Sequence, residues 1–349
     1  MKKYLLPESG NFYKANLHCH STISDGRLSP EELKKAYMDK GYSIIAYTDH
    51  DIFLPHTELN DENFLALHGF EVEMMGPLAP DDKKGKYRKR CHLCFVALEQ
   101  DNLTQICWHR SKYVWGNGLK YKDQVKFDEN EPDYERSMAP ERINDMIRIG
   151  REKGFFVTYN HPVWSQEKYE EYMAYDGMNA MEIYNHSSAI VGHEEYCYLI
   201  YDYMLRAGKK LYCIAADDNH NGRDVNAPGS DSFGGFIWIK ADKLEYRTIT
   251  KALEDGYFYA STGPEIYDLW YEDGWVHIKT SEAVKISANY AGLRGCAAHG
   301  TEDAPITEAA LPVDPDDKFI RITVFDKRGN RATTSAYFVE DLMRSEEDE

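Results

Sequence analysis

The sequence predicts an α/β fold in which helices connect parallel strands, followed by a small antiparallel β domain. Three segments repeat one order: an amphipathic helix, a glycine, an apolar strand and then His or Asp. That order is typical of βα units. Alternation of apolar and polar residues, which is typical of antiparallel strands, begins only near residue 268.

The first repeat has a strong helix start. In "SPEEL", Ser29 can cap the helix, Pro30 suits its first position, and the Glu32 carboxylate can accept a hydrogen bond from the N–H of the cap residue. Gly41 suits the left-handed turn that ends a helix. The following "YSIIAYT" is predicted to be a buried strand, and "DHD" follows it directly.

Two more repeats follow the first. "APERINDMIRIGREKG" predicts a helix that stops at Gly154, before the strand "FFVTYN" and His161. "GHEEYCYLIYDYMLRAG" predicts a helix that stops at Gly208, before the strand "LYCIAA" and the sequence "DDNH". The apolar face of this last helix would comprise Tyr196, Leu199, Ile200, Tyr203 and Met204. Further strands without such clear helices are "LALHGFEVE", "CHLCFVALE" and "NAMEIYN".

Side chains of the metal-ligand type follow these predicted strands. In α/β barrels the catalytic residues lie where strands end at the carboxyl face, so residues distant in sequence would meet at one mouth. His18 and His20 alternate on one strand and therefore point to the same side. Asp25 follows them in an "SDG" turn. The other candidates are His50, Glu71, Glu73, His92, His161, Asp218 and His220, with Asp217 as an alternative to Asp218.

Together these residues resemble the PHP (polymerase and histidinol phosphatase) superfamily of metal-dependent hydrolases. The resemblance covers about residues 12–265 and rests on HxH with a following "SDG", then "TDHD", Glu, His, "HP" and a final DxH. The closing "YFYASTGPEI" further resembles the CehA/McbA-type branch. The resemblance implies a distorted (β/α)7 TIM-like barrel that binds two or three divalent metal ions, namely Mn, Fe or Zn.

The resemblance also implies a set of metal ligands. The first ion would be held by His18, His20, Glu71 and Asp218, the second by Glu71, His92 and His161, and the third by Asp25, His50 and His220. Some family members have histidine where this chain has Asp25, so the third site is expected to be harder in character and weaker or more open. Glu73 and Asp49 are expected behind the ligands.

The implied reaction is attack of metal-bound hydroxide on the phosphorus of a small phosphorylated metabolite or nucleotide. A metal-bound water, His220 or a nearby acid would help the leaving group, and Arg223, three residues after His220, is a candidate for catalysis and for substrate binding. Glu182 and His186, around "MEIYN", are undecided between structural roles and substrate binding. Two alternatives stay open: a metal-dependent carboxylic ester or carbamate hydrolase on the same site, and a non-catalytic metal-binding module.

Composition excludes several other classes. The net charge of −18 argues against binding of long nucleic acids, which requires a positive surface. No apolar run is long enough for a membrane helix or a signal peptide, so a cytoplasmic protein without membrane contact is expected. The odd number of cysteines, 7, favours free thiols over a disulfide framework. The expected partner is a small phosphoester, and the oligomeric state is left open.

Two loops and the domain boundaries complete the prediction. The basic run "KKGKYRKR", residues 83–90, is expected to be a solvated hairpin loop, with attraction of phosphorylated substrates as the alternative. Residues 105–138 form a long aromatic and polar insertion that is expected to be a lid. The barrel would span residues 1–267 and a small β-sandwich-like domain residues 268–343, with a disordered acidic tail at 344–349.

Overall fold

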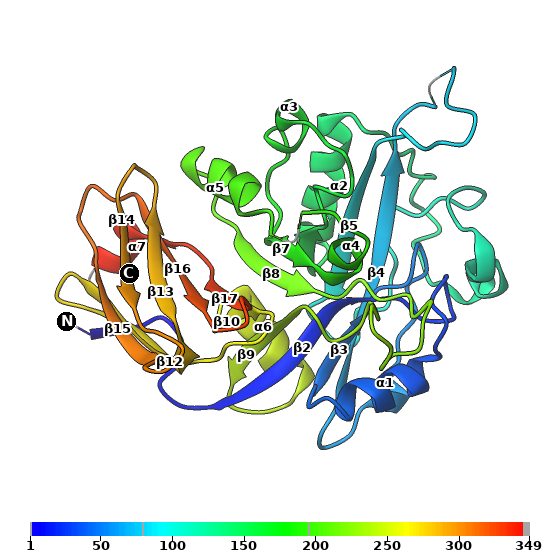
Figure 1. The fold of residues 1–349 in the computed structure, drawn as a ribbon. Helices are drawn as coiled ribbons and strands as arrows, with labels where there is room; N and C mark the ends of the chain where they lie inside the picture. Colours follow the sequence, from blue (N-terminus) through cyan, green and yellow to red (C-terminus); the bar gives the residue numbers. More distant parts are fainter. Residues whose placement is uncertain (1, 79, 195, 345–349) are drawn as a thin grey trace.

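The computed structural model describes residues 2–78, 80–194 and 196–344 and has a mixed α/β fold (Figure 1). The strands are β1 (Lys2–Tyr4), β2 (Asn11–Cys19), β3 (Ile44–Tyr47), β4 (Leu65–Met75), β5 (Arg90–Ala97), β6 (Phe155–Tyr159), β7 (Ala180–Asn185), β8 (Tyr212–Ala216), β9 (Phe236–Ala241), β10 (Phe258–Ser261), β11 (Ile266–Glu272), β12 (Trp275–Ala283), β13 (Lys285–Tyr290), β14 (Gly295–His299), β15 (Ile306–Pro312), β16 (Phe319–Phe325), β17 (Arg331–Thr334) and β18 (Tyr337–Phe338). The helices are α1 (Pro30–Met38), α2 (Pro140–Glu152), α3 (Tyr169–Tyr172), α4 (His186–Ile190), α5 (Tyr198–Arg206), α6 (Tyr246–Glu254) and α7 (Val339–Met343). Short 3₁₀ helices are η1 (Thr57–Leu59), η2 (Gly116–Lys120) and η3 (Lys122–Gln124).

Strand pairing among the described residues produces a 14-stranded sheet and a 4-stranded sheet. The large sheet has the order β14-β13-β16-β17-β10-β9-β2-β3-β4-β5-β6-β7-β8, and β18 pairs with β16. Strands β2, β3 and β4 are parallel, as are β6, β7 and β8. Strand β5 is antiparallel to both of its neighbours, because a hairpin connects it to β4. The expected run of uniformly parallel strands is therefore interrupted at β5.

The two ends of the β2–β8 path come back together. The Asp218 N–H donates to His18 O at 3.0 Å, the His20 N–H donates to Asn219 O at 3.2 Å, and Cys19 forms a parallel bridge with Asn219. The ends of β2 and β8 are thus adjacent, although they stand far apart in the strand order. This closure brings together the sequences that follow the first and last strands of the path.

The helices follow the predicted starts and stops with one correction. Helix α1 has the expected capping box, in which the Glu32 N–H donates to the Ser29 hydroxyl and the Ser29 N–H donates to the Glu32 carboxylate. Helix α5 is shorter than predicted and starts at Tyr198, because Tyr196 bridges to β7 and the Cys197 N–H donates to Ile183 O. The predicted apolar face was also partly wrong, since Leu199 is 61% exposed. The buried face comprises Tyr201, Met204 and Leu205.

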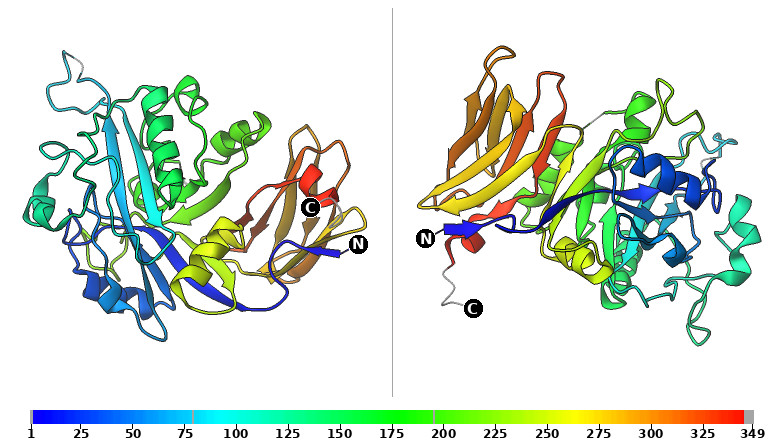
Figure 2. Two further views of the ribbon diagram at one scale, coloured as in Figure 1. Left: turned by 180° about the vertical axis from the view of Figure 1, so that it is seen from behind. Right: turned by 90° about the horizontal axis from the view of Figure 1, so that it is seen from below.

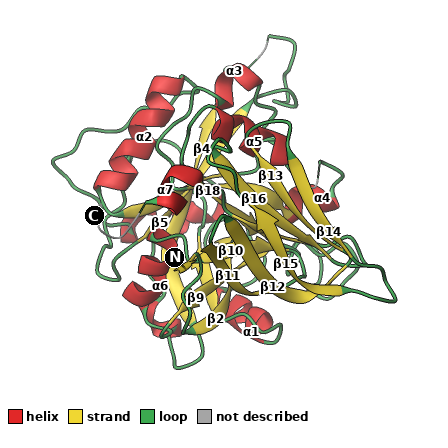
Figure 3. Cartoon of the chain, turned by 90° about the vertical axis from the view of Figure 1, so that its left-hand side faces the viewer, coloured by secondary structure: helices red, strands yellow, loops and turns green. Residues whose placement is uncertain are grey.

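The C-terminal strands continue the large sheet and add a second layer (Figure 2). Strands β1, β11, β12 and β15 form the smaller sheet, which shares an apolar core with β13, β16 and β17. Figure 3 shows β11, β12, β13, β15 and β16 together. Strand β1 pairs with β11, so the start of the chain packs with its C-terminal part. The predicted domain boundary at residues 267 and 268 stays a prediction, and of the acidic tail residues 345–349 lie outside the described residues.

The two predicted loops differ in structure. Residues 76–89 connect β4 and β5 as a hairpin, which agrees with the expected solvated loop. The insertion at residues 105–138 is largely irregular and carries η2 and η3. It packs on the rest of the chain through a small apolar cluster, in which its Trp108 and Val125 contact Ile23 and Ile52. Among the described residues no helix is long and apolar enough to cross a membrane.

Candidate metal centre

The first group of possible metal ligands comprises His18, His20, Glu71 and Asp218. One donor atom of each lies within 4.8 Å of the others. His18 Nε2 is 3.0 Å from Glu71 Oε1, and His20 Nε2 is 3.1 Å from Asp218 Oδ1. His18 lies on β2 and His20 directly follows the strand, and the Nε2 atoms of the two rings are 3.1 Å apart.

The second group shares Glu71 with the first and adds His92 and His161. His92 Nδ1 is 3.0 Å and His161 Nε2 is 3.4 Å from Glu71 Oε1. His92 stands near the start of β5, and because β5 runs antiparallel to β4, this position is opposite Glu73 and close to Glu71. The side chains of His18, Glu71 and His161 are all 2% exposed or less.

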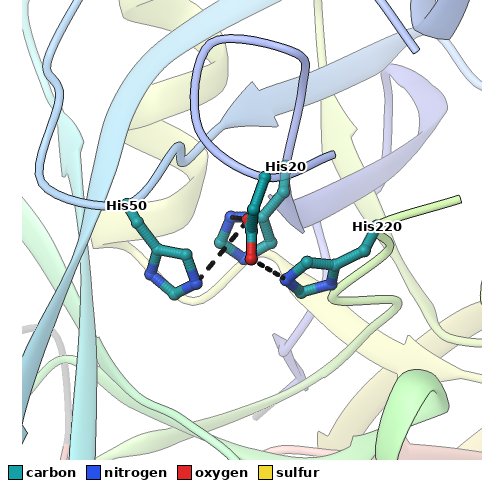
Figure 4. A group of neighbouring side chains, drawn as sticks. His20, His50 and His220 are labelled. Carbon is teal, nitrogen blue, oxygen red and sulfur yellow. Dashed lines mark ion pairs between the residues drawn. The ribbon is translucent and has the colours of Figure 1, made fainter. Parts of the chain in front are cut away.

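The third group comprises Asp25, His50 and His220, and it also includes His20. Asp25 lies 3.4 Å from His220 Nε2, 3.9 Å from His50 Nε2 and 4.0 Å from His20 Nδ1. Figure 4 shows the three rings directed towards one point. The sequence prediction placed His20 in the first group alone, whereas the ring faces the first group with Nε2 and the third with Nδ1. This group is the most open, with the Asp25 and His220 side chains 29% and 31% exposed.

Glycine allows the turn that carries Asp25 to fold against β2. The Gly26 N–H donates to Ser21 O at 2.9 Å, and a Cβ at Gly26 would lie 2.4 Å from His20 O. The Asp49 carboxylate stabilises the same turn by accepting hydrogen bonds from the N–H and hydroxyl groups of Ser21 and Ser24. Asp49 therefore supports the ligand turn and does not join a ligand group.

Divalent cations fit these residues. His20 Nδ1, His50 Nδ1 and Glu71 Oε2 are buried and make no hydrogen bond. His50 Nδ1 and Glu71 Oε2 face each other at 3.1 Å, and His20 Nδ1 is 4.0 Å from Asp25 Oδ1. Buried polar atoms otherwise form hydrogen bonds, so donor atoms that face one another without one are typical of a cation site. Mixed imidazole and carboxylate donors suit Mn, Fe or Zn in open hydrolytic centres, whereas structural zinc sites are closed sets of Cys and His.

The pKa shifts show how strongly the donors interact without a cation. Burial alone would raise the pKa of Glu71, but the imidazoles of His92 and His18 hold it well below its usual range. Burial disfavours charge on His92, yet the Glu71 and Glu73 carboxylates raise the pKa of His92 to about 10. Burial lowers the pKa of His50 to about 3. Protons on some imidazoles thus balance the carboxylates, and cation binding would displace those protons.

Two ligands lie in an unusual backbone conformation. His161 and Asp218 have φ values of 27° and 54°, in the left-handed region that non-glycine residues seldom adopt. Such strain is typical of functional sites, where the surrounding structure enforces it. The Asp217 carboxylate is directed elsewhere, because it accepts hydrogen bonds from the N–H groups of Phe233, Gly234 and Gly235. Asp218, and not Asp217, therefore faces the ligand groups.

Seven of the nine candidate ligands, all except His18 and His20, line a cavity of about 200 Å³. Besides ligands, its lining comprises Glu73, Arg90, Trp115, Trp164, Ser187 and Ser188. Sequence reasoning did not identify the two tryptophans or the two serines. The available signals were weak: Trp115 belongs to the long insertion, Trp164 follows "HP", and Arg90 ends the basic run.

The three residues that were predicted to bind the substrate do not line this cavity. Arg223 is exposed and donates to Pro228 O at 3.4 Å, and its predicted contact with the substrate stays a prediction. His186 contacts the Tyr184 hydroxyl at 2.9 Å and Ser230 O at 3.1 Å. Glu182 is buried 2.7 Å from His18 Nδ1 and orients that ring. Substrate binding by His186 and Glu182 stays a prediction.

Comparisons with known proteins give limited matches. No family model matches the chain. Over 38 residues, 11% of the chain, the sequence is 53% identical to a 5'-3' exoribonuclease of Haemophilus influenzae, and this stretch covers only 14% of that relative. The activity of that whole protein therefore cannot be transferred directly.

Several solved structures are similar at low identity. A two-domain protein from Bacteroides vulgatus, described as containing a predicted PHP-like metal-dependent phosphoesterase, aligns over 96% of this chain and 90% of its own, with a TM-score of 0.40 and 15% identity. A Bifidobacterium adolescentis protein, provisionally described as a metal-dependent phosphoesterase, aligns over 62% of this chain and 91% of its own, with a TM-score of 0.38 and 15% identity. An amidohydrolase from Chromobacterium violaceum aligns over 59% of this chain and 87% of its own, with a TM-score of 0.36 and 14% identity. At these TM-scores the likeness carries no argument about activity.

Proposed function

We propose that this chain is a PHP-type metal-dependent hydrolase that cleaves a phosphoric ester of a small molecule or short nucleotide. The observation that carries the proposal is the contiguity of the three ligand groups, which Glu71 and His20 link to one another. Isolated structural metal sites do not share donors in this way. The closure between β2 and β8 supports the further proposal that the β2–β8 path is the distorted (β/α)7 barrel of that family.

Each part of the site has a chemical role in this proposal. Divalent cations in the ligand groups would lower the pKa of water and would stabilise negative charge on the phosphoryl oxygens. Glu71 holds the first and second groups at a fixed separation, because its Oε1 atom is 3.0 Å from both His18 and His92. Glu182 orients the His18 ring. The same carboxylate accepts a hydrogen bond from the backbone N–H of His161 at 2.9 Å and so positions that residue.

Hydrolysis forms a bond between phosphorus and the water oxygen and breaks the bond between phosphorus and the ester oxygen, which takes up a proton. His220 is the proposed assistant of this departure; it lines the cavity and is the most exposed imidazole of the third group. The cavity of about 200 Å³ suits a phosphoryl group with a small part of its ester, and only the end of a longer chain could enter.

A substrate panel tests this function and separates it from the alternative. The chain is stripped with a chelator, reloaded with Mn, Fe or Zn, and assayed on aryl phosphate monoesters and diesters, a short oligonucleotide, aryl carboxylic esters and aryl carbamates. We expect cation-dependent turnover of phosphoesters that falls at least about a thousandfold in His18→Ala and Glu71→Gln.

His299→Ala is the matched control, because His299 is exposed on β14 and distant in sequence from every ligand. Turnover of carboxylic esters or carbamates alone would replace the proposal with the alternative. Absence of turnover with every cation, or unchanged turnover in the two ligand variants, would reject both.

A further inference from the structure

Two tryptophans line the candidate metal cavity without being able to bind a metal. Trp115 belongs to the insertion and is 48% exposed. Its ring centroid lies 5.6 Å from that of His50, a ligand of the third group. Trp164 follows His161 and lies on a different segment, with its ring centroid 5.0 Å from that of His161.

Trp115 is exposed although an apolar cluster lies next to it. The insertion buries Trp108 to 7% exposure in a cluster with Val125 and Ile52, so an apolar interior is available next to Trp115. A large indole that stays at a cavity mouth in this setting is typical of a binding surface.

The position of Trp164 is fixed by backbone contacts. The Ser165 N–H donates to His161 O at 3.1 Å, and the Arg90 N–H donates to Ser165 O at 3.3 Å. The Arg90 guanidinium lies 5.7 Å from the Trp164 ring and pairs through Nη1 with Glu73. Trp164 is thus held beside the second group, with the Arg90 guanidinium near its ring.

We infer that Trp115 and Trp164 form a subsite for a planar aromatic ring in the organic part of the ester. This inference rests on the proposed function, since a phosphoryl group at the ligand groups leaves the rest of the ester among the other residues that line the cavity. Indole rings stack on aromatic rings of every kind and gain far less from a small alkyl group. The preferred substrates are then aryl or nucleobase-bearing phosphoesters.

The test compares the binding of phenylphosphonate and methylphosphonate, which share a headgroup and differ only in the ring. Calorimetry on the Mn-loaded chain gives the ratio of the two dissociation constants without any turnover. We expect phenylphosphonate to bind at least about fivefold tighter to the wild-type chain. The ratio should fall close to one in Trp115→Ala and in Trp164→Ala, and should persist in the corresponding phenylalanine variants.

Trp275→Ala is the control, because Trp275 has a similar exposure of 44% and lies on β12, outside the cavity. A wild-type ratio near one, an unchanged ratio in either alanine variant, or no binding of either phosphonate would overturn the subsite. A nucleoside phosphonate in the same titration distinguishes aryl esters from nucleobase-bearing esters. The phosphonate that binds more tightly identifies the preferred class of substrate. A ring preference without turnover would reject the proposed function alone, and turnover with a flat ratio would reject the subsite alone.

Discussion

His18 Nδ1 lies 2.7 Å from Glu182 Oε1, and both side chains are almost fully buried. This contact directs Nε2 of the same ring to the first ligand group, where it lies 3.0 Å from Glu71. A carboxylate behind a metal-binding imidazole fixes the orientation of the ring and increases its basicity. Glu182 thus acts on the metal centre through His18.

Glu182→Gln should weaken cation binding by about 10–100-fold, because the amide carries no charge to support the imidazole. Competition with a chelator of known affinity measures this change. Urea unfolding of the variant should remain a single transition, which shows that the fold persists. A cation affinity equal to that of the wild-type chain would refute the assigned role.

Replacing shared and unshared ligands should have different effects on the number of bound cations. Glu71 belongs to two groups, so Glu71→Ala is expected to abolish more than one cation. Asp25 belongs only to the third group, so Asp25→Asn should abolish one cation at most. Elemental analysis of the reloaded variants measures the stoichiometry. Equal losses in both variants would contradict the grouping.

The insertion is fastened to the site by a buried ion pair. Arg136 Nη1 lies 2.6 Å from Asp51 Oδ1, and each side chain is 3% exposed. Removing one partner leaves an uncompensated buried charge, so Arg136→Met should lower the free energy of unfolding by about 3–5 kcal/mol. Arg148→Met, which breaks surface pairs with Asp145 and Glu152, should cost no more than about 1 kcal/mol. Urea denaturation measures the free energy of unfolding of both variants. Equal losses would contradict the proposed attachment of the insertion through the Arg136–Asp51 pair.

Stability should depend on pH through Glu167. Burial raises the pKa of this carboxyl to about 7, against hydrogen bonds from Tyr159 and Tyr175, with Cys91 and Glu171 also nearby. A raised carboxyl pKa means that the folded state binds the proton more tightly, so stability is lost as pH rises from about 4.5 through about 7.

The uncharged variant Glu167→Gln removes this dependence. Its stability relative to the wild-type chain should therefore improve between pH 5 and pH 8, by up to about 3 kcal/mol. Urea unfolding at several pH values in the presence of chelator measures the difference and removes the effect of metal binding. A constant difference over that pH range would show that Glu167 titrates normally.

Local sequence rules predicted the elements that depend on local contacts. The cap at Ser29 and the turns at Gly41 and Gly154, with φ values of 78° and 79°, follow from short-range chemistry. The spacing of His18 and His20, at the end of β2 and directly after it, likewise predicted that the two rings lie together, and their Nε2 atoms are 3.1 Å apart. These rules, together with the family resemblance, grouped the ligand residues that the structure brings together.

Long-range contacts decided what the sequence could not predict. His20 reaches the third group because the turn at residues 21–26 folds back against β2. Helix α5 starts late because Tyr196 pairs with β7, a contact without a local signal. Arg223, although close to His220 in sequence, turns away to Pro228. Proximity in sequence is thus a poor guide wherever a loop reverses direction.

Anomalous scattering from a crystal soaked with manganese tests the central claim most directly. The account predicts peaks at the manganese edge within the three groups around Glu71 and His20, with the weakest peak beside Asp25 in the most open group. Absence of any peak within these groups, or peaks only at other places on the molecule, would contradict it.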